Sequence, residues 1–128
     1  MLFESIHHIA IIGRNYNKTK EFYIEKLGFE IISEHHRVDK NDIIINVEKE
    51  NVVLEIFIKE DAPLRPPIPN PENTGLRHLA FKVKDVEKTL EEFDILKIEH
   101  QGLRYDDFDG KKMAFFFDPD GLPLEIHE

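Results

Sequence analysis

The sequence predicts an α+β fold made of two copies of a βαβββ unit. The segment His8-Ile9-Ala10-Ile11 recurs as His78-Leu79-Ala80-Phe81, and Leu54-Glu55-Ile56 recurs as Leu124-Glu125-Ile126. Both recurrences have an offset of 70 residues, and in each copy the His and the Glu are 47 residues apart. A repeat of this length is a complete supersecondary unit rather than a short motif.

The first copy reads as one strand, one helix and three strands. A segment rich in isoleucine predicts a strand over 6–13, ended by a Gly-Arg-Asn turn. The spacing of Phe22, Tyr23 and Leu27 predicts a helix over 17–27 that stops at Gly28. Charged residues and glycine then separate three expected strands, over 29–34, 43–48 and 52–59.

The second copy repeats this order, with a strand over 77–83, a helix over 86–93, and strands over 98–103, 112–117 and 122–127. We therefore expect a single domain over 1–128, with repeat 1 at about 5–59 and repeat 2 at about 75–128. The linker 60–74 contains five prolines, which exclude a regular helix or a central strand. Its length suits a lid, an intersubunit arm or a passive surface connection.

Length and composition narrow the class of protein. The 128 residues suit one domain, and a chain 41% hydrophobic without a long apolar run is not expected to enter a membrane. We expect no signal peptide and a cytoplasmic location. The absence of cysteine excludes thiolate chemistry. A net charge of −9 without a basic cluster argues against a nucleic-acid partner.

The repeated His and Glu residues occupy one face of the predicted strands. Side chains alternate along a strand, so His8 lies opposite Ile9, and Glu125 lies opposite Leu124 and Ile126. The isoleucine- and leucine-rich face is expected to pack on the helices. The His and Glu residues then line the other, concave face. His7 is expected to face away from His8.

A carboxylate inside an apolar strand is costly unless a partner neutralises it. Taken singly, each residue also fits a core histidine or a glutamate paired with Lys or Arg. The matched offsets favour one divalent metal ion held by His8, Glu55, His78 and Glu125. Two nitrogen and two oxygen ligands with room for water suit six-coordinate Ni, Co, Fe or Mn, and also allow Zn. His127 shares a face with Glu125, but we expect it to meet solvent.

Four motifs run along the chain: His7-His8-Ile9-Ala10, Phe22-Tyr23 with Leu27-Gly28-Phe29, the segment from Gly75 to Phe81, and Phe117-Asp118-Pro119-Asp120-Gly121 ahead of Leu124-Glu125. Together they resemble the vicinal-oxygen-chelate superfamily, and within it the glyoxalase I-like (lactoylglutathione lyase-like) proteins. The resemblance implies a cupped mixed sheet, the fold shared by glyoxalases, bleomycin-resistance proteins and dioxygenases. It also implies a site with the ligands named above, a preference for Ni or Co, and a homodimer.

The activity implied by the resemblance is that of a lyase in methylglyoxal detoxification. Such an enzyme isomerises the hemithioacetal of a 2-oxoaldehyde, here methylglyoxal, to a thioester. Glu125 is the first choice for the catalytic base and Glu55 the second. Two alternatives stay open. One is another metalloenzyme of the superfamily (an epimerase, a dioxygenase or a resistance transferase), and the other is a non-catalytic small-molecule binding protein.

Three positions depart from the glyoxalase pattern, and one of them is Leu122, where the related proteins usually have a Tyr after the Asp-Pro-Asp-Gly turn. Ile12 and Lys59 stand where well-matched bacterial glyoxalases have the Arg and Asn that hold glutathione. The candidate substrate contacts, each also explicable as a surface charge or an apolar surface, are Lys59, Arg65, Arg77, Arg104, Phe115 and Phe117. The run from Phe115 to Phe117 adds an argument for a dimer, since one small domain does not easily hide three adjacent aromatic rings.

Overall fold

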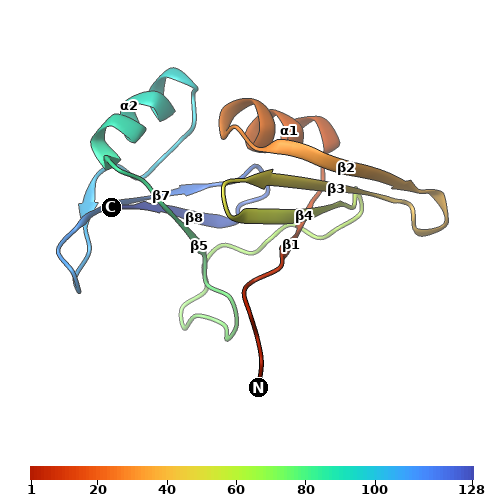
Figure 1. Cartoon of the computed structure of the whole chain (residues 1–128), viewed down its shortest axis with the longest axis horizontal. Coiled ribbons are helices and arrows are strands. Elements are labelled where there is room, and N and C mark those ends of the chain that lie inside the picture. The colour runs from red at the N-terminus through yellow and green to blue at the C-terminus, as the bar shows by residue number, and fades with distance from the viewer. The chain divides into compact units, whose positions relative to one another are not determined.

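The computed structural model describes all 128 residues and divides the chain into two compact units, Met1–Pro63 and Leu64–Glu128. The division falls inside the linker predicted over 60–74. Each unit contains one four-stranded mixed sheet with a helix on one of its faces (Figure 1). This arrangement confirms the α+β class and the βαβββ order in both halves.

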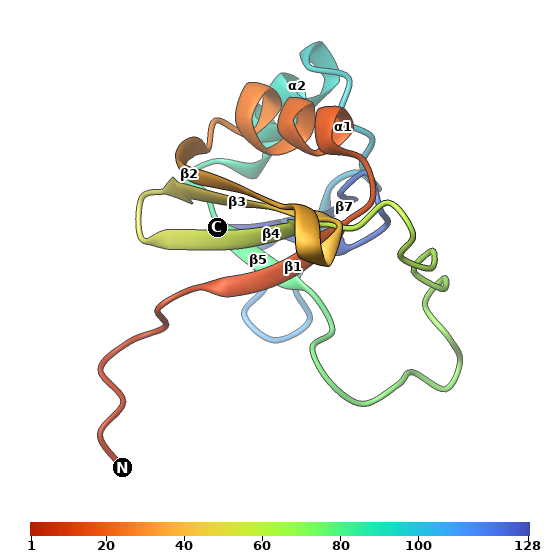
Figure 2. The same ribbon diagram turned by 90° about the vertical axis from the view of Figure 1, so that its right-hand side faces the viewer.

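Unit 1 is built on the sheet order β1-β4-β3-β2, in which β1 runs parallel to β4 and the other neighbours are antiparallel. The helical segment lies over the sheet (Figure 2). It begins at Asn15, whose side chain accepts a hydrogen bond from the Lys18 amide at 2.9 Å and so caps the first turn. The elements of unit 1 are β1 Ile9–Gly13, α1 Tyr16–Lys20, η1 Glu21–Lys26, β2 Glu30–Arg37, η2 Val38–Lys40, β3 Asp42–Lys49 and β4 Val52–Ile58.

The helix predicted over 17–27 is present but not uniform. Its second half, η1, is a π-helical turn, and Leu27 donates its amide to the Phe22 carbonyl at 2.9 Å. The wide turn points Phe22 and Tyr23 into the core, where Tyr23 is 1% exposed. A π-turn accommodates an extra residue in a helix and leaves no clear mark in the apolar spacing.

Unit 2 repeats the topology with the sheet order β5-β8-β7-β6, and β5 runs parallel to β8. Asp85 caps its helix by accepting the Lys88 amide at 3.0 Å. None of the helices in the chain is long and apolar enough to cross a membrane. The elements of unit 2 are β5 Leu79–Lys82, α2 Val86–Ile95, β6 Arg104–Tyr105, β7 Lys112–Phe117 and β8 Pro123–His127.

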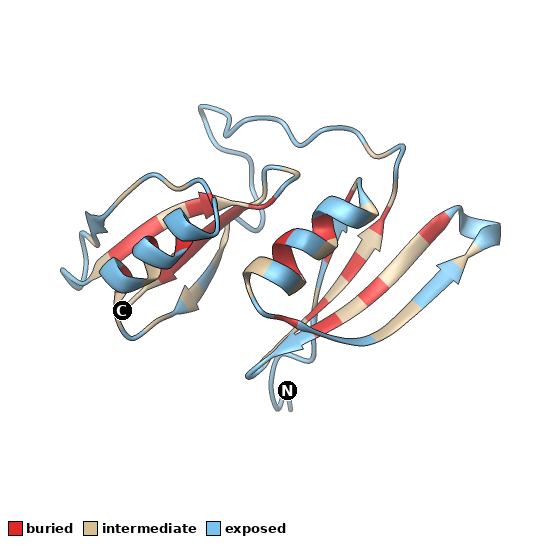
Figure 3. Cartoon of the chain, turned by 90° about the horizontal axis from the view of Figure 1, so that it is seen from above, coloured by how far each residue is buried: buried red, intermediate tan, exposed pale blue.

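In each unit the core lies between the helix and one face of the sheet (Figure 3). In unit 1 the sheet side includes Leu54, Ile56 and Ile58, and in unit 2 it includes Phe116, Leu124 and Ile126, all buried. The alternation predicted for the strands is thereby confirmed for these apolar residues.

The strand predicted over 98–103 is wrong. Strand β6 spans only Arg104–Tyr105, and the predicted segment contributes one isolated bridge, between His100 and Phe116. Ile98 is buried as part of the core, and Gly102 adopts a positive φ of 82°, which interrupts an extended chain. The first strands of both units also begin later than predicted, at Ile9 and Leu79.

Candidate functional site

The face of each sheet that the helix does not cover is called here the open face. In unit 1, Glu55 of β4 lies in register with Ala10 of β1 and Asn46 of β3 on this face. In unit 2, Glu125 of β8 lies in register with Ala80 and Phe115. The two glutamates therefore occupy equivalent positions in the two sheets.

In unit 1, His8 and Glu55 form a loose pair. The His8 Nε2 atom lies 4.0 Å from Glu55 Oε1, and the two side chains are 40% and 29% exposed. The expectation that His7 faces away from His8 is wrong, because their Nδ1 atoms are 2.8 Å apart. Both histidines precede β1, so the alternation of a strand does not apply to them.

In unit 2, His78 and Glu125 form a tighter and more buried pair. His78 Nε2 lies 3.1 Å from Glu125 Oε2, and the side chains are 23% and 8% exposed. The Phe115 ring packs edge-on against the imidazole, with centroids 5.2 Å apart. The Arg104 guanidinium lies 5.5 Å from the centroid of the same ring. Of the predicted substrate contacts, Phe115 therefore stands next to the His78–Glu125 pair, and Arg104 lies near the Phe115 ring.

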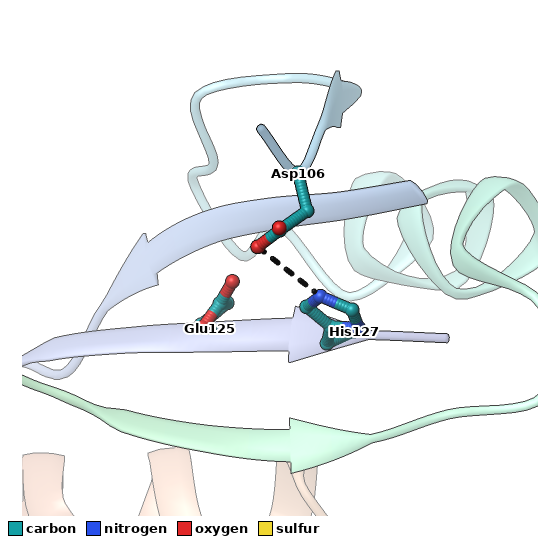
Figure 4. A group of neighbouring side chains, drawn as sticks. All are labelled: Asp106, Glu125 and His127. Atoms are coloured by element: carbon teal, nitrogen blue, oxygen red, sulfur yellow. Dashed lines mark ion pairs between the residues drawn. The ribbon is translucent and has the colours of Figure 1, made fainter. Parts of the chain in front are cut away.

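Two further side chains lie near Glu125 (Figure 4). Asp106 follows β6, and His127 lies two residues after Glu125 on β8. Asp106, Glu125 and His127 each place one potential ligand atom within 4.8 Å of those of the other two. The expectation that His127 meets solvent is wrong, because its Nε2 lies 3.4 Å from Asp106 and 3.5 Å from Asp109.

Asp106 and His127 each favour the charged form of the other. The His127 Nδ1–H donates to the Glu128 carbonyl at 2.7 Å, which raises the pKa of His127, and the carboxylates of Asp109 and Asp106 raise it further. The backbone amides of Phe108 and Asp109 donate to Asp106 and lower the pKa of its carboxyl group. Asp106 is thus held as an acceptor facing the imidazole.

The turn before β8 fixes the position of Glu125. Asp118 Oδ1 accepts hydrogen bonds from the amides of Asp120 and Leu122, each at 2.9 Å. Gly121 takes the positive φ of 85° that closes the turn. The Asp-Pro-Asp-Gly motif singled out in the sequence is therefore the structural device that sets the register of β8.

Lys59, another predicted substrate contact, belongs to a charged network on unit 1. The buried carboxylate of Asp42 accepts two hydrogen bonds from Arg37, at 2.7 and 2.6 Å, and one from Lys59 at 2.9 Å. Arg37 first and Lys59 second hold the pKa of Asp42 well below its usual range. The ammonium of Lys59 therefore already has a strong partner in this structure.

The remaining predicted contacts line a groove in unit 2. The groove has a volume of about 710 Å³ and lies between the proline-rich segment 65–69 and the Phe117–Pro123 end of β7 and β8. Arg65 and Arg77 both line it, and Arg77 Nε donates to Glu72 at 2.6 Å. That hydrogen bond is the main cause of the raised pKa of Arg77, to which the charge of Glu125 also adds.

Sequence reasoning missed Asp106 as a neighbour of Glu125 and misplaced His127. The position of His127, two residues after Glu125, indicates that both side chains lie on the same face of the strand. No sequence pattern places Asp106 near Glu125, because the position of Asp106 depends on the conformation of the short loop after β6.

The chain matches the model of the Glyoxalase/Bleomycin resistance protein/Dioxygenase superfamily over residues 5–126. It belongs to this superfamily. The uncharacterized protein YwkD of Bacillus subtilis (strain 168) is 44% identical to this chain, and the match covers 100% of this chain and 99% of YwkD.

Solved structures of the superfamily fold agree with this placement. A glyoxalase family protein from Enterococcus faecalis is 55% identical, with a TM-score of 0.93 and complete coverage of both chains. A lactoylglutathione lyase from Agrobacterium tumefaciens is 19% identical, with a TM-score of 0.69 over 97% of this chain and 92% of that one. At that identity the likeness concerns the fold alone.

Proposed function

We propose that this protein is a metal-dependent lyase of the glyoxalase I type. One divalent ion, preferably Ni or Co, is held by His8, Glu55, His78 and Glu125. The observation that carries the proposal is the repeated His–Glu pair, which occurs at equivalent positions on the open faces of both units.

The distance within each pair is compatible with two ligands of one metal ion. With metal–ligand bonds of about 2.0–2.2 Å, two ligand atoms on one ion are separated by roughly 2.8–4.4 Å, depending on the angle between the bonds. The separations of 3.1 Å in unit 2 and 4.0 Å in unit 1 both fall inside this interval. Two imidazoles and two carboxylates also match the charge and ligand preferences of a divalent transition metal.

The reaction needs a base that moves one proton between neighbouring carbons of the substrate. A bound metal supplies Lewis-acid stabilisation of negative charge on the substrate oxygens. Glu125 accepts the C–H proton and returns it to the adjacent carbon. Its carboxylate suits this role because it is only 8% exposed and is held on one side by His78, at 3.1 Å.

The first experiment is to remove all metal, reload the protein with Ni or Co, and follow conversion of methylglyoxal and glutathione to the thioester. We expect turnover that chelation abolishes and that reloading restores. Bound metal should be counted in parallel by elemental analysis. Failure to retain any divalent metal contradicts the proposal, and metal retention without turnover contradicts the glutathione substrate.

Two observations favour a second candidate, another metalloenzyme of the superfamily that acts on a different vicinal-oxygen substrate. Ile12 is apolar and 56% exposed, and Lys59 is bound to Asp42. Neither residue offers the free polar group that holds glutathione in the related lyases. An assay panel that replaces glutathione by other thiols at fixed methylglyoxal separates the two candidates. Turnover with any thiol supports the lyase, whereas bound metal without turnover for every thiol favours the second candidate.

We also propose that the protein works in the cytoplasm as a homodimer. Phe115 and Phe117 support the dimer because both are half-buried on the open face, whereas Phe116 is 1% exposed in the core and no longer counts as surface. Sedimentation at micromolar concentration tests the assembly, and a species that stays monomeric contradicts it.

A further inference from the structure

The groove in unit 2 differs in charge from the protein as a whole. Its charged lining residues are two arginines and one glutamate, so it carries one net positive charge in a chain whose net charge is −9. Most of its other walls are apolar, from Ile68, Leu76 and several prolines. A volume of about 710 Å³ lies within the range of small-molecule sites.

The two arginines are available to a ligand. Arg65 is exposed on the groove wall. Arg77 is paired with Glu72, but their side chains are 64% and 45% exposed. An ion pair at such an exposed position contributes little to stability, because solvent screens it. A carboxylate that desolvates part of the groove can therefore replace Glu72 as the partner of Arg77.

The floor of the groove is continuous with the strand that carries Glu125. Pro123 lines the groove and lies two residues before Glu125 on the same face of β8, a separation of about 7 Å along a strand. Phe117, also in the lining, pairs with Pro123, and Phe115 pairs with Glu125. A molecule whose reacting end lies at Glu125 thus reaches the groove with a short apolar chain.

We propose that this groove binds the tail of a small ligand with an aliphatic body and one terminal carboxylate, read by Arg65 and Arg77. That the ligand is the substrate, as the carboxylate-bearing thiol part of a hemithioacetal, rests on the proposed lyase function. The charge and the lining of the groove select this class of ligand. A neutral tail would leave the two arginines without a partner from the ligand. A large polyanion does not match a groove with apolar walls and one net positive charge.

The binding test uses hexanoate as the anionic probe and hexanamide as its neutral match, on the metal-free full-length protein labelled with ¹⁵N. We expect hexanoate to shift the amides of Thr74, Leu76 and Gly121 saturably, and hexanamide to bind about tenfold more weakly, as expected for loss of a charge-assisted contact. Equal affinities for the two probes, or shifts elsewhere only, overturn the proposal.

Three variants give effects of different sign. Arg65→Gln should weaken hexanoate binding, whereas Glu72→Gln should strengthen it because Arg77 loses its competing partner. Lys84→Gln removes one positive charge from an exposed position outside the groove and should change nothing. Weaker binding in Glu72→Gln, or equal losses in Arg65→Gln and Lys84→Gln, contradicts a specific carboxylate site.

The link to the reaction is tested separately on metal-loaded protein. The hemithioacetal of methylglyoxal with 6-mercaptohexanoate should have a higher kcat/KM than that with 6-mercaptohexanol, and Arg65→Gln should remove the preference through KM. Hexanoate binding without metal retention supports the groove and contradicts the lyase. Metal-dependent turnover without hexanoate binding contradicts the groove and leaves the lyase standing.

Discussion

The two units share a topology but differ in how firmly they hold their His–Glu pairs. In unit 2 the nitrogen and oxygen atoms of the pair are 3.1 Å apart and Glu125 is 8% exposed. In unit 1 the separation is 4.0 Å and Glu55 is 29% exposed. One repeat has kept the same residues in a more open environment.

The difference comes from the side chains around each glutamate rather than from the topology of the two sheets. Glu125 has Phe115 beside it in register, and Asp106 and His127 also lie near it. Glu55 has the small Ala10 and the polar Asn46 as its register neighbours. A buried, oriented carboxylate favours a catalytic base, and an exposed one favours a ligand that has only to bind.

The largest expected effect concerns the two glutamates. Glu125→Gln should lower kcat by about 10²–10⁴-fold, the usual contribution of a general base. Its metal affinity should stay within about tenfold, since an amide oxygen still coordinates. Glu55→Gln is the matched variant and should lose less turnover. Steady-state kinetics on metal-loaded protein decide, and wild-type-like activity of Glu125→Gln rules out this assignment.

A second comparison concerns the two cores, where equal effects are expected. Leu54 and Leu124 are equivalent residues and both are 0% exposed. Leu54→Ala and Leu124→Ala should each destabilise the protein by about 2–5 kcal/mol, through lost burial and the cavity left behind. Urea unfolding followed by circular dichroism measures both changes. A variant of unaltered stability contradicts the burial of its leucine.

Metal affinity offers a smaller contrast. His78 is already oriented against Glu125, whereas His8 is 40% exposed and has more side-chain freedom to lose on binding. Removing His78 should therefore cost more, and we expect His78→Ala to bind Ni about tenfold more weakly than His8→Ala. Competition with a chromophoric chelator measures both constants. The reverse order indicates that unit 1 provides the stronger half of the site.

The smallest effect is a pH dependence confined to unit 1. Arg37 and Lys59 lower the pKa of folded Asp42 below its ordinary value of about 3.9. The contribution of ionised Asp42 to the stability of the fold is therefore complete well above pH 4. It is lost as the pH falls through and below that value, because the carboxylate becomes protonated. Asp42→Asn should be less stable at pH 7 and should lose less stability on acidification.

The control for this prediction is Asp61→Asn, which removes a carboxylate from an exposed turn of the same unit. It should keep both the stability and the acid sensitivity of the wild type. Thermal unfolding between pH 7 and pH 3 compares the three proteins. An Asp42→Asn variant with the acid sensitivity of the wild type excludes the proposed role of Asp42.

The sequence alone predicted the architecture because the repeat and the alternation of apolar residues are global signals. Both helices and most strands follow from them, and Lys112–Phe117 is observed with the bounds expected. The short strand near Arg104 was missed because Gly102 and the buried Ile98 depend on local backbone geometry. The π-turn Glu21–Lys26 was missed for a similar reason.

The candidate site was only partly accessible from sequence. The equivalence of Glu55 and Glu125 follows from the offset of the repeat, but their different exposure depends on neighbours that the repeat does not share, such as Phe115 and Asp106 near Glu125. Asp106 lies in the loop after β6, and Asp42, the partner of Lys59, is the first residue of β3. Contacts made across loops need the register of the sheet before they can be assigned.

The hydrogen-bonded turn at Asp118 restricts where related sequences can gain or lose residues. Because Asp118 binds the amides of Asp120 and Leu122, the number of residues between it and Glu125 decides which way the carboxylate points. Inserting or deleting one residue there turns Glu125 toward the helix and brings Leu124 or Ile126 to the open face. Length variation should therefore accumulate in loops such as the proline-rich segment, while this short stretch tolerates substitution but not insertion.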